Sequence, residues 1–155
     1  MKLMDFLSKK SIVADLKSTK KEDIIRELVD ALINAGELEK SCRAKVFEAL
    51  MERESLGSTA IGQGIAIPHA KTDCVSRLVA AFALSRKGVD FDSLDGEPVY
   101  IFFLLLAAQD SAGPHLKALA RISRLFKDRY FRDNLRNCSD DKEVIQVITQ
   151  EDEKI

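Results

Sequence analysis

The chain has 155 residues, of which 46% are hydrophobic and 32% are charged, a balance typical of a globular protein rather than a disordered one. Its 24 lysines and arginines against 25 aspartates and glutamates give a net charge of −1. This balance provides neither the basic excess of a nucleic-acid-binding protein nor an acidic solvating tail. The length suits a single domain over residues 1–155 with one hydrophobic core.

Cysteine usage and the apolar runs indicate the compartment. Cys42, Cys74 and Cys138 are odd in number and form no C-x-x-C pair, which argues against a disulfide framework and fits a reducing compartment. The N-terminus carries charge too early for a secretory signal, and the longest apolar run, Val99–Ala108, is far shorter than the roughly 20 residues that cross a bilayer. We therefore expect a cytoplasmic protein without membrane insertion, in which Cys74 is an incidental, half-buried thiol.

The first third of the chain predicts two packing helices. The first begins behind Thr19, which matches a capping box with Glu22, and ends at Gly36. The second is expected from Ser41 to about Glu54. Apolar residues at helical spacing give each helix an inward face: Ile24, Ile25, Leu28, Val29 and Leu32 in the first, and Val46, Phe47, Leu50 and Met51 in the second.

Two apolar runs, residues 78–84 and Val99–Ala108, predict interior strands of a sheet that is covered on both faces. The Asp95-Gly96 pair between them is a strong turn signal, so the two strands should form an antiparallel hairpin.

The last third of the chain is predicted to be helical. Apolar residues follow helical spacing after Pro114, a short segment covers residues 130–136, and a final helix begins at Asp140, which with Ser139 is a natural cap. The expected fold is one α/β domain, a mixed parallel and antiparallel sheet with helices on both faces.

The segment "IGQGIAIPHA" joins the second helix to the first apolar strand. Its two glycines permit close backbone approach, while Ile65 and Ile67 can anchor alternate positions in the core. Pro68 removes a donor and fixes one dihedral angle, so we expect strand pairing to stop there. His69 would then emerge at the edge of the sheet on a stiff backbone, an arrangement that suits an exposed and well-aimed group.

Several chemistries could use an imidazole at position 69. His69 could act as the base for Ser58 or Cys74, although no G-x-S-x-G motif is present. It could bind a metal together with Asp73, Cys74 and His115, although no dense ligand cluster joins them. A neutral ring nitrogen of His69 could itself attack a phosphoryl group without a base. The simplest alternative is a structural histidine at a strand end.

His115 strengthens the phosphoryl interpretation. It follows Pro114, which fits the first position of a helix, with Ser111 or Gly113 at the cap. The start of a helix favours an anion and keeps a histidine neutral, so His115 could donate a hydrogen bond to phosphate oxygens beside His69.

The segment Glu54–Ala70, "ESLGSTAIGQGIAIPHA", resembles the phosphorylation signature of the fructose/mannitol-type enzyme IIA domains of the bacterial phosphotransferase system. Glu54, Ile61-Gly62 and the Ile65–Ala70 string fill every position of that pattern. The stretches "EALMERESLGST", "DFDSLDGEPVYIFFLLLAA" and "HLKALARISRLF" also resemble the family, so the likeness covers nearly the whole chain.

The resemblance implies that His69 accepts a phosphoryl group from the phosphocarrier HPr or from an HPr-like protein of the nitrogen branch. His115 and Arg53 match the histidine and arginine that stabilise the phosphohistidine. Ser58, Thr59 and the loop amides could supply further hydrogen bonds, and neither a metal nor a cofactor is required.

Two uses of such a protein are open. A sugar-specific IIA passes its phosphoryl group to a IIB cysteine, whereas a nitrogen-related IIA regulates target proteins through its phosphorylation state. The signature of this chain resembles the nitrogen-regulatory type more closely. A pure interaction module and a metal-dependent hydrolase are two other classes.

A carrier would need an apolar docking surface around His69. Ile61, Ile65, Ala70 and Val75 are the candidates for it.

Overall fold

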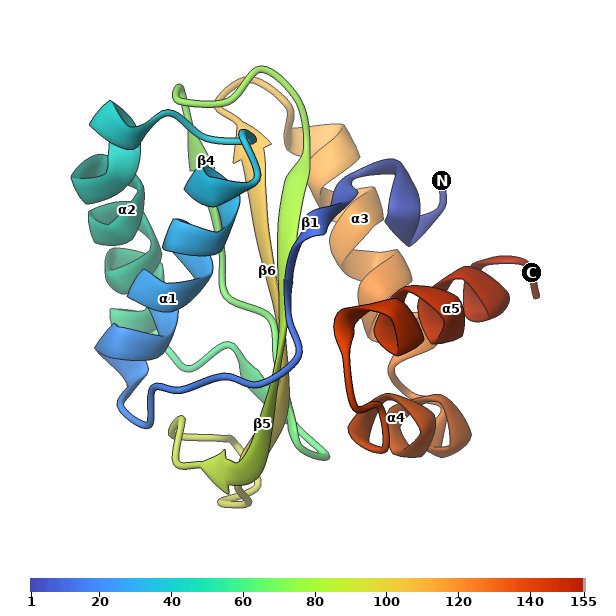
Figure 1. Cartoon of the computed structure of the whole chain (residues 1–155). Helices are drawn as coiled ribbons and strands as arrows, with labels where there is room; N and C mark the ends of the chain where they lie inside the picture. Colours follow the sequence, from blue (N-terminus) through green and yellow to red (C-terminus); the bar gives the residue numbers. More distant parts are fainter. Residues whose placement is uncertain (155) are drawn as a thin grey trace.

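A six-stranded mixed sheet forms the centre of the molecule, with helices packed on both of its faces (Figure 1). The computed structural model describes residues 1–154. Five strands follow the order β1-β5-β6-β3-β2, and β4 also pairs with β6. The strands are β1 Leu7–Val13, β2 Ala60–Gly62, β3 Ile65–Ala66, β4 His69–Thr72, β5 Val79–Val89 and β6 Val99–Ala108.

The two apolar runs form the central hairpin of this sheet, as predicted. β5 and β6 pair antiparallel from Val79↔Leu106 to Val89↔Val99, and Gly96 adopts the positive φ of 74° that the turn between them requires. β1 pairs parallel with β5, and β3 and β4 pair parallel with β6, so the predicted mixed α/β fold is confirmed.

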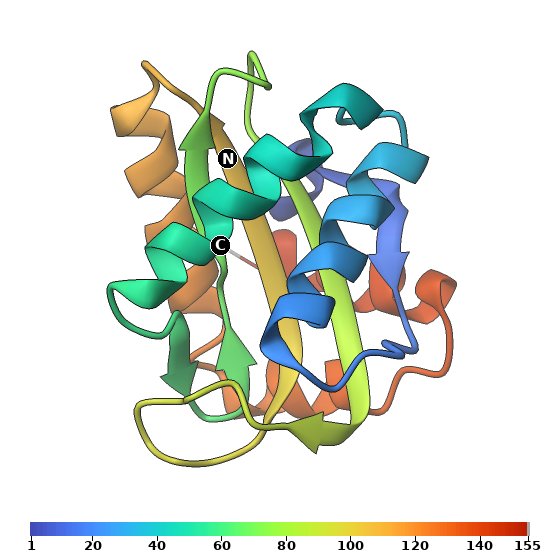
Figure 2. The ribbon, with the colours of Figure 1, turned by 90° about the vertical axis from the view of Figure 1, so that its left-hand side faces the viewer.

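Helices cover the two faces unequally. α1 Lys21–Asn34 and α2 Arg43–Ser55 lie on one face, which Figure 2 turns toward the viewer, and α3 Ala112–Leu125, α4 Arg129–Arg136 and α5 Asp141–Asp152 lie on the other. Short 3-10 turns, η1 Leu3–Asp5 and η2 Lys40–Cys42, precede β1 and α2. The sheet therefore separates two apolar cores, one under each helical layer.

The predicted helix ends are partly confirmed. Gly36 follows α1 with φ 77° and donates to the Ile33 carbonyl, and Asp140 caps α5 by accepting from the amide of Glu143. The predicted capping box at Thr19 is wrong, because the cap residue of α1 is Lys20, whose side chain makes no capping hydrogen bond. The segment before α1 is instead held by a side chain of the helix, because the amide and the hydroxyl of Ser18 both donate to the carboxylate of Glu27.

Strand pairing does not stop at Pro68, contrary to the prediction. β3 pairs with β6 up to Ala66↔Phe102, and pairing resumes at His69↔Leu105. Pro68 lacks a donor, but its carbonyl still accepts from the Leu105 amide at 2.9 Å. The proline therefore interrupts the ladder briefly and divides one extended segment into β3 and β4.

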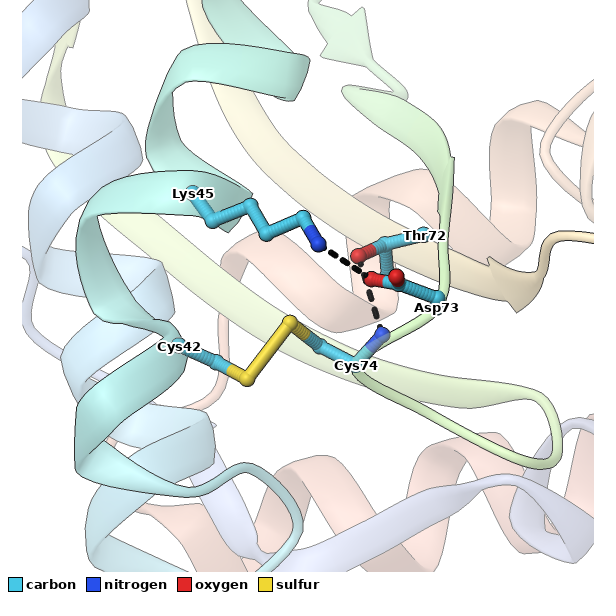
Figure 3. The surroundings of a disulfide bond; sticks show 5 residues. All are labelled: Cys42, Lys45, Thr72, Asp73 and Cys74. Atoms are coloured by element: carbon cyan, nitrogen blue, oxygen red, sulfur yellow. Dashed lines mark hydrogen bonds and ion pairs between the residues drawn. A yellow bond between two sulfur atoms is a disulfide. The ribbon is translucent and has the colours of Figure 1, made fainter.

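Two cysteines form a disulfide, contrary to the sequence-based argument against disulfide bonding. Cys42 at the cap of α2 is bonded to Cys74, two residues beyond β4 (Figure 3). Their Cα atoms are 6.2 Å apart, within the usual range for a disulfide. Cys74 is therefore not an incidental thiol, and Cys138 is the free and buried cysteine of the described residues.

A buried ion pair fixes α3, the helix that carries His115, to both ends of the chain. Arg121 donates to the Asp152 carboxylate at 3.2 Å, and the same carboxylate accepts from the backbone amides of Leu3 and Met4. One side chain of α5 thus satisfies three buried or half-buried donors from two other elements, η1 and α3.

Asp152→Ala is expected to lower the free energy of unfolding by about 3 kcal/mol, because it leaves the Arg121 charge and two amides without their acceptor. Urea denaturation of the variant measures this loss. Glu153→Ala, at the exposed next position, is the matched control and should change the stability little. Equal stabilities of the two variants would contradict the structural role of Asp152.

Candidate functional site

His69 is held at the first position of β4, an edge strand whose neighbour in the sheet is β6. Ile67 and Pro68 before it and Ala70 after it are buried, whereas His69 is half-buried. The backbone on both sides is thus fixed by the core, as the sequence predicted for Ile65 and Ile67, while the imidazole remains accessible.

The His69 ring is oriented by a backbone carbonyl. Nδ1 lies 2.8 Å from the carbonyl oxygen of Ile67. A carbonyl oxygen can only accept, so Nδ1 carries the hydrogen and the neutral ring keeps its lone pair on Nε2. The backbone therefore selects both the ring position and the tautomer.

His115 lies directly beside this ring, as predicted. The two ring centroids are 5.5 Å apart and the planes meet at 69°. His115 is buried, and its Nε2 has no hydrogen-bond partner among the described residues. A buried polar atom without a partner is uncommon in proteins, and it marks a place where a polar ligand could bind.

The start of α3 differs in detail from the prediction. Ser111 is the cap, which is one of the two expected positions, but the helix begins at Ala112, so Pro114 is its third residue. The His115 amide already donates to the Ser111 carbonyl at 3.1 Å. His115 can therefore serve an anion through its ring and not through its backbone.

Arg53 reaches the site from the last turn of α2. Its Nη1 donates to the Gly57 carbonyl at 2.9 Å. The neighbouring Glu54 is buried and accepts from the Thr59 amide and hydroxyl and from Lys21, which fixes the turn after the helix. The guanidinium is thus a permanent positive charge at the end of α2, held against a well-defined turn.

These side chains meet at one open pocket of about 400 Å³. α2 presents one face to it, since its lining residues follow the spacing of three and four that aligns helical side chains. The pocket is lined by Ala49, Glu52, Arg53, Leu56, His69, Ala70, Lys71 and His115.

The pKa values of both histidines are lowered from the ordinary value of an imidazole. Burial lowers the pKa of His69, and the positive charge of Arg53 lowers it further, against the opposing effects of the Ile67 carbonyl and Glu54. Burial also lowers the pKa of His115, with contributions from His69 and Lys71. A neutral His69 at pH 7 has the free Nε2 lone pair that a nucleophile needs.

Ser58 and Thr59 do not reach this pocket. The Ser58 hydroxyl donates to the Phe91 carbonyl at 2.7 Å, and the buried Thr59 hydroxyl donates to Glu54 at 2.6 Å. Both side chains shape the loop behind Arg53, so the phosphate-binding role expected for their hydroxyls has no geometric support.

The other chemistries considered for His69 lack their partners. The sulfur of Cys74 is bonded in the disulfide, and Asp73 forms an ion pair with Lys45 at 2.7 Å. The hydroxyl of Ser58 donates its hydrogen to the Phe91 carbonyl. Across residues 1–154, no group of three histidine, cysteine or acidic side chains is arranged to hold a metal ion. Among the same residues, no helix combines the length and the apolar character needed to span a bilayer.

The docking surface differs from the one predicted. Ile65 and Val75 are buried and the exposed Ile61 lines another hollow, whereas Ala70, although mostly buried, does line the pocket. The exposed apolar side chain that lines the pocket is Leu56, at 80%, and Leu116, the residue after His115 in the chain, is 67% exposed. The sequence held a signal for Leu56, because it follows Arg53 by three residues and so continues the same helical face.

Lys71 is a further lining residue that the sequence reasoning missed. It stands two residues after His69, and side chains at that spacing project from the same side of a strand.

Comparison with known proteins identifies the family. The model of the "Phosphoenolpyruvate-dependent sugar phosphotransferase system, EIIA 2" family matches residues 5–151. The chain belongs to this family. The resemblance stated from the signature around His69 is thereby confirmed.

Relatives of both kinds are found within the EIIA family. The nitrogen regulatory protein of Bradyrhizobium diazoefficiens is 38% identical over 148 residues, which cover 96% of this chain and 95% of that protein. The fructose-specific EIIABC component of Bacillus subtilis is 40% identical over 152 residues, which cover 98% of this chain and 24% of that protein. This EIIA chain therefore spans a small part of the fructose component and nearly all of the nitrogen regulatory protein.

The fold of this EIIA protein is that of a solved nitrogen-branch structure. IIA-Ntr from Neisseria meningitidis superposes with a TM-score of 0.84 at 35% sequence identity. The match covers 93% of this chain and 97% of the Neisseria chain.

Both histidines are expected to titrate below the ordinary value of about 6.5. The unfolded chain therefore takes up protons first as the pH falls below that value, and the free energy of unfolding decreases until the folded-state pKa values are passed. Nitrogen NMR of the imidazoles measures these titrations and identifies the His69 tautomer.

Arg53→Gln should raise the pKa of His69, because it removes a neighbouring positive charge. Arg43→Gln, on the same helix but outside the pocket, is the control.

A hydrogen on Nε2 instead of Nδ1 in neutral His69 would contradict the proposed orientation of the ring.

Proposed function

We propose that this chain is a phosphocarrier of the phosphoenolpyruvate-dependent phosphotransferase system and that His69 is its phosphoryl acceptor. The observation that carries the proposal is the Nδ1–Ile67 contact, which leaves Nε2 as the free nucleophile in a pocket shared with His115 and Arg53. Membership of the EIIA family supports the phosphotransfer role.

The chemistry at His69 needs no base. The Nε2 lone pair attacks the phosphorus of a donor phosphohistidine, the new P–N bond forms, and the donor P–N bond breaks as the donor imidazole leaves. The positive charge that develops on the His69 ring is stabilised because Nδ1–H donates to the Ile67 carbonyl.

The protein stabilises the phosphoryl group by electrostatics. Phosphoryl transfer spreads negative charge over three oxygens, and a fixed positive group with well-placed donors lowers its energy. Arg53 supplies the permanent charge, and the unpartnered Nε2 of His115 supplies a donor when it carries the hydrogen. The pocket is open and shallow, which suits transfer to and from another protein rather than retention of phosphate.

The donor is an HPr-like carrier that docks over the pocket. The exposed Leu56 lines the pocket with the two histidines and provides an apolar contact, and Lys71 adds a positive rim. The phosphorylation state of the site then regulates partner proteins, as in the nitrogen branch. Support for this branch comes from the nitrogen regulatory relative, which this chain matches over nearly its whole length.

A sugar-specific IIA function is the second candidate beside regulation, because the fructose-specific relative is equally similar in sequence. In that use, a IIB cysteine thiolate attacks the phosphorus on His69 and carries the group to a carbohydrate. The site chemistry on His69 is the same for both uses.

We expect the purified chain to take up one acid-labile phosphoryl group when it is incubated with phosphoenolpyruvate, enzyme I and an HPr-like carrier. Intact mass spectrometry measures the uptake. His69→Gln keeps the size and polarity of the side chain but has no ring nucleophile, so it should remain unmodified. No uptake from any cognate carrier, or uptake by His69→Gln, would overturn the assignment.

Arg53→Gln and His115→Ala should reach the same final uptake as the unaltered chain but with rates lower on the order of 10- to 100-fold, because each removes one stabilising group. Single-turnover transfer from a prephosphorylated carrier measures the rates. Arg43→Gln, which loses an exposed ion pair with Asp30, is the matched control. Wild-type rates in both pocket variants would remove them from the site.

The phosphorylated chain is expected to keep its phosphoryl group in the presence of a purified fructose-type IIB domain. Tracking the group by phosphoprotein electrophoresis tests this expectation. The phosphorylated EIIA portion of a fructose-specific component serves as the positive control. Rapid transfer from this chain to the IIB cysteine would favour the sugar use over regulation.

A further inference from the structure

The Cys42–Cys74 disulfide joins the two elements that hold the candidate site. Cys42 is the cap residue of α2, and the last turn of that helix carries Arg53. Cys74 lies two residues beyond β4, and His69 begins that strand. Figure 3 shows the bond crossing from the helix to the strand segment. The covalent link thus ties the far end of α2 to the far end of β4.

Noncovalent contacts at this junction are weak by comparison. Lys45 and Asp73 form an ion pair at 2.7 Å, but both side chains are mostly exposed, so solvent screens their attraction. The Cys74 amide donates to Thr72 within its own segment and does not reach α2. Reduction of the disulfide would therefore remove the covalent constraint on the beginning of α2 and leave the largely exposed ion pairs Lys45–Asp73 and Arg43–Asp30 there.

Both cysteines are suited to exchange with other thiols. Each is half-buried, so a small thiol or disulfide can approach the sulfur atoms. Cys42 stands at the amino end of a helix, where the helix dipole stabilises a thiolate. The third cysteine is a built-in control, because burial raises the pKa of Cys138 to about 11 and keeps that thiol protonated.

We propose that Cys42 and Cys74 form a reversible redox switch that sets the rate of phosphoryl transfer at His69. This inference rests on the proposed function of His69 and adds a regulatory input to the same site. In the oxidised state the disulfide holds α2 against the β4 segment, and in the reduced state the two thiols release the start of the helix.

The exchange chemistry balances with glutathione disulfide as the oxidant. The Cys42 thiolate attacks one sulfur of glutathione disulfide and releases one glutathione thiolate. The Cys74 thiolate then attacks the Cys42 sulfur and releases the second, so two protein thiols become one disulfide while glutathione disulfide becomes two glutathiones. An excess of a small dithiol reverses both steps and is itself oxidised to its disulfide.

The disulfide form should be the faster acceptor. It contains the arrangement described above, with Arg53 and His69 lining one pocket. After reduction, the buried Val46 and Leu50 still hold α2 in the core, so the helix shifts without detaching. We expect a slowing of about three- to tenfold, less than the ~10²-fold that a 1 Å misplacement can cost.

The test compares the oxidised and reduced unaltered chain in single-turnover transfer from a desalted, prephosphorylated HPr-like carrier. Alkylation followed by peptide mass spectrometry establishes the state of Cys42 and Cys74 in each sample. The expected result is faster transfer to the oxidised form, with full reversal after a cycle of reduction and reoxidation. Both forms should reach the same final phosphorylation.

Variants separate the switch from a general effect of the reagents. Cys42→Ser/Cys74→Ser should transfer at the rate of the reduced chain and ignore both reagents, whereas Cys138→Ala should respond like the unaltered chain. Equal rates for the two forms, or a response that survives in the double variant, would overturn the switch while leaving the phosphocarrier function intact. Absence of phosphorylation in both forms would instead count against the phosphocarrier function, and the switch would fall with it.

Discussion

The parallel pairing of β4 with β6 is the constraint on which the site depends. It fixes His69 opposite Leu105, and the Pro68 carbonyl keeps a bond to that partner although the proline has no donor of its own. The Ile67 carbonyl, two residues before His69, is then in place to accept from Nδ1 at 2.8 Å. Sheet geometry therefore determines the tautomer, and the tautomer determines which ring nitrogen can react.

The edge position of β4 explains how helices from opposite faces of the sheet can serve one imidazole. α2 and α3 flank the strand in Figure 2, one from each layer. A side chain on a central strand points into one helical layer only, whereas a side chain on an edge strand can be approached from both layers. Arg53 and His115 approach His69 in this way, and the pocket stays open to a protein partner. Within the part of the chain that the structure describes, no further strand pairs with the outer edge of β4, so this edge remains available to a protein partner.

The same arrangement makes the site sensitive to the position of α2. The helix is anchored at its centre by buried Val46 and Leu50, at its end by the Glu54–Thr59 contacts, and at its beginning by the Cys42–Cys74 bond. The first two anchors are noncovalent and permanent, whereas a disulfide depends on the redox conditions around the protein. Control of the rate through that bond would leave the fold and the nucleophile unchanged.

Sequence alone determined the long elements and pointed to the proposed nucleophile of this protein. Uninterrupted apolar runs specified β5 and β6, apolar periodicity specified helices of both layers, and the Pro-His signature singled out His69, because these signals depend on residues that are neighbours along the chain. Only the tertiary structure decided which side chains meet. The disulfide joins positions 32 residues apart, Ser58 and Thr59 turn toward the loop, and Ile65 and Val75 are buried instead of lying at the docking surface. Such choices depend on how distant segments pack, which local spacing does not encode.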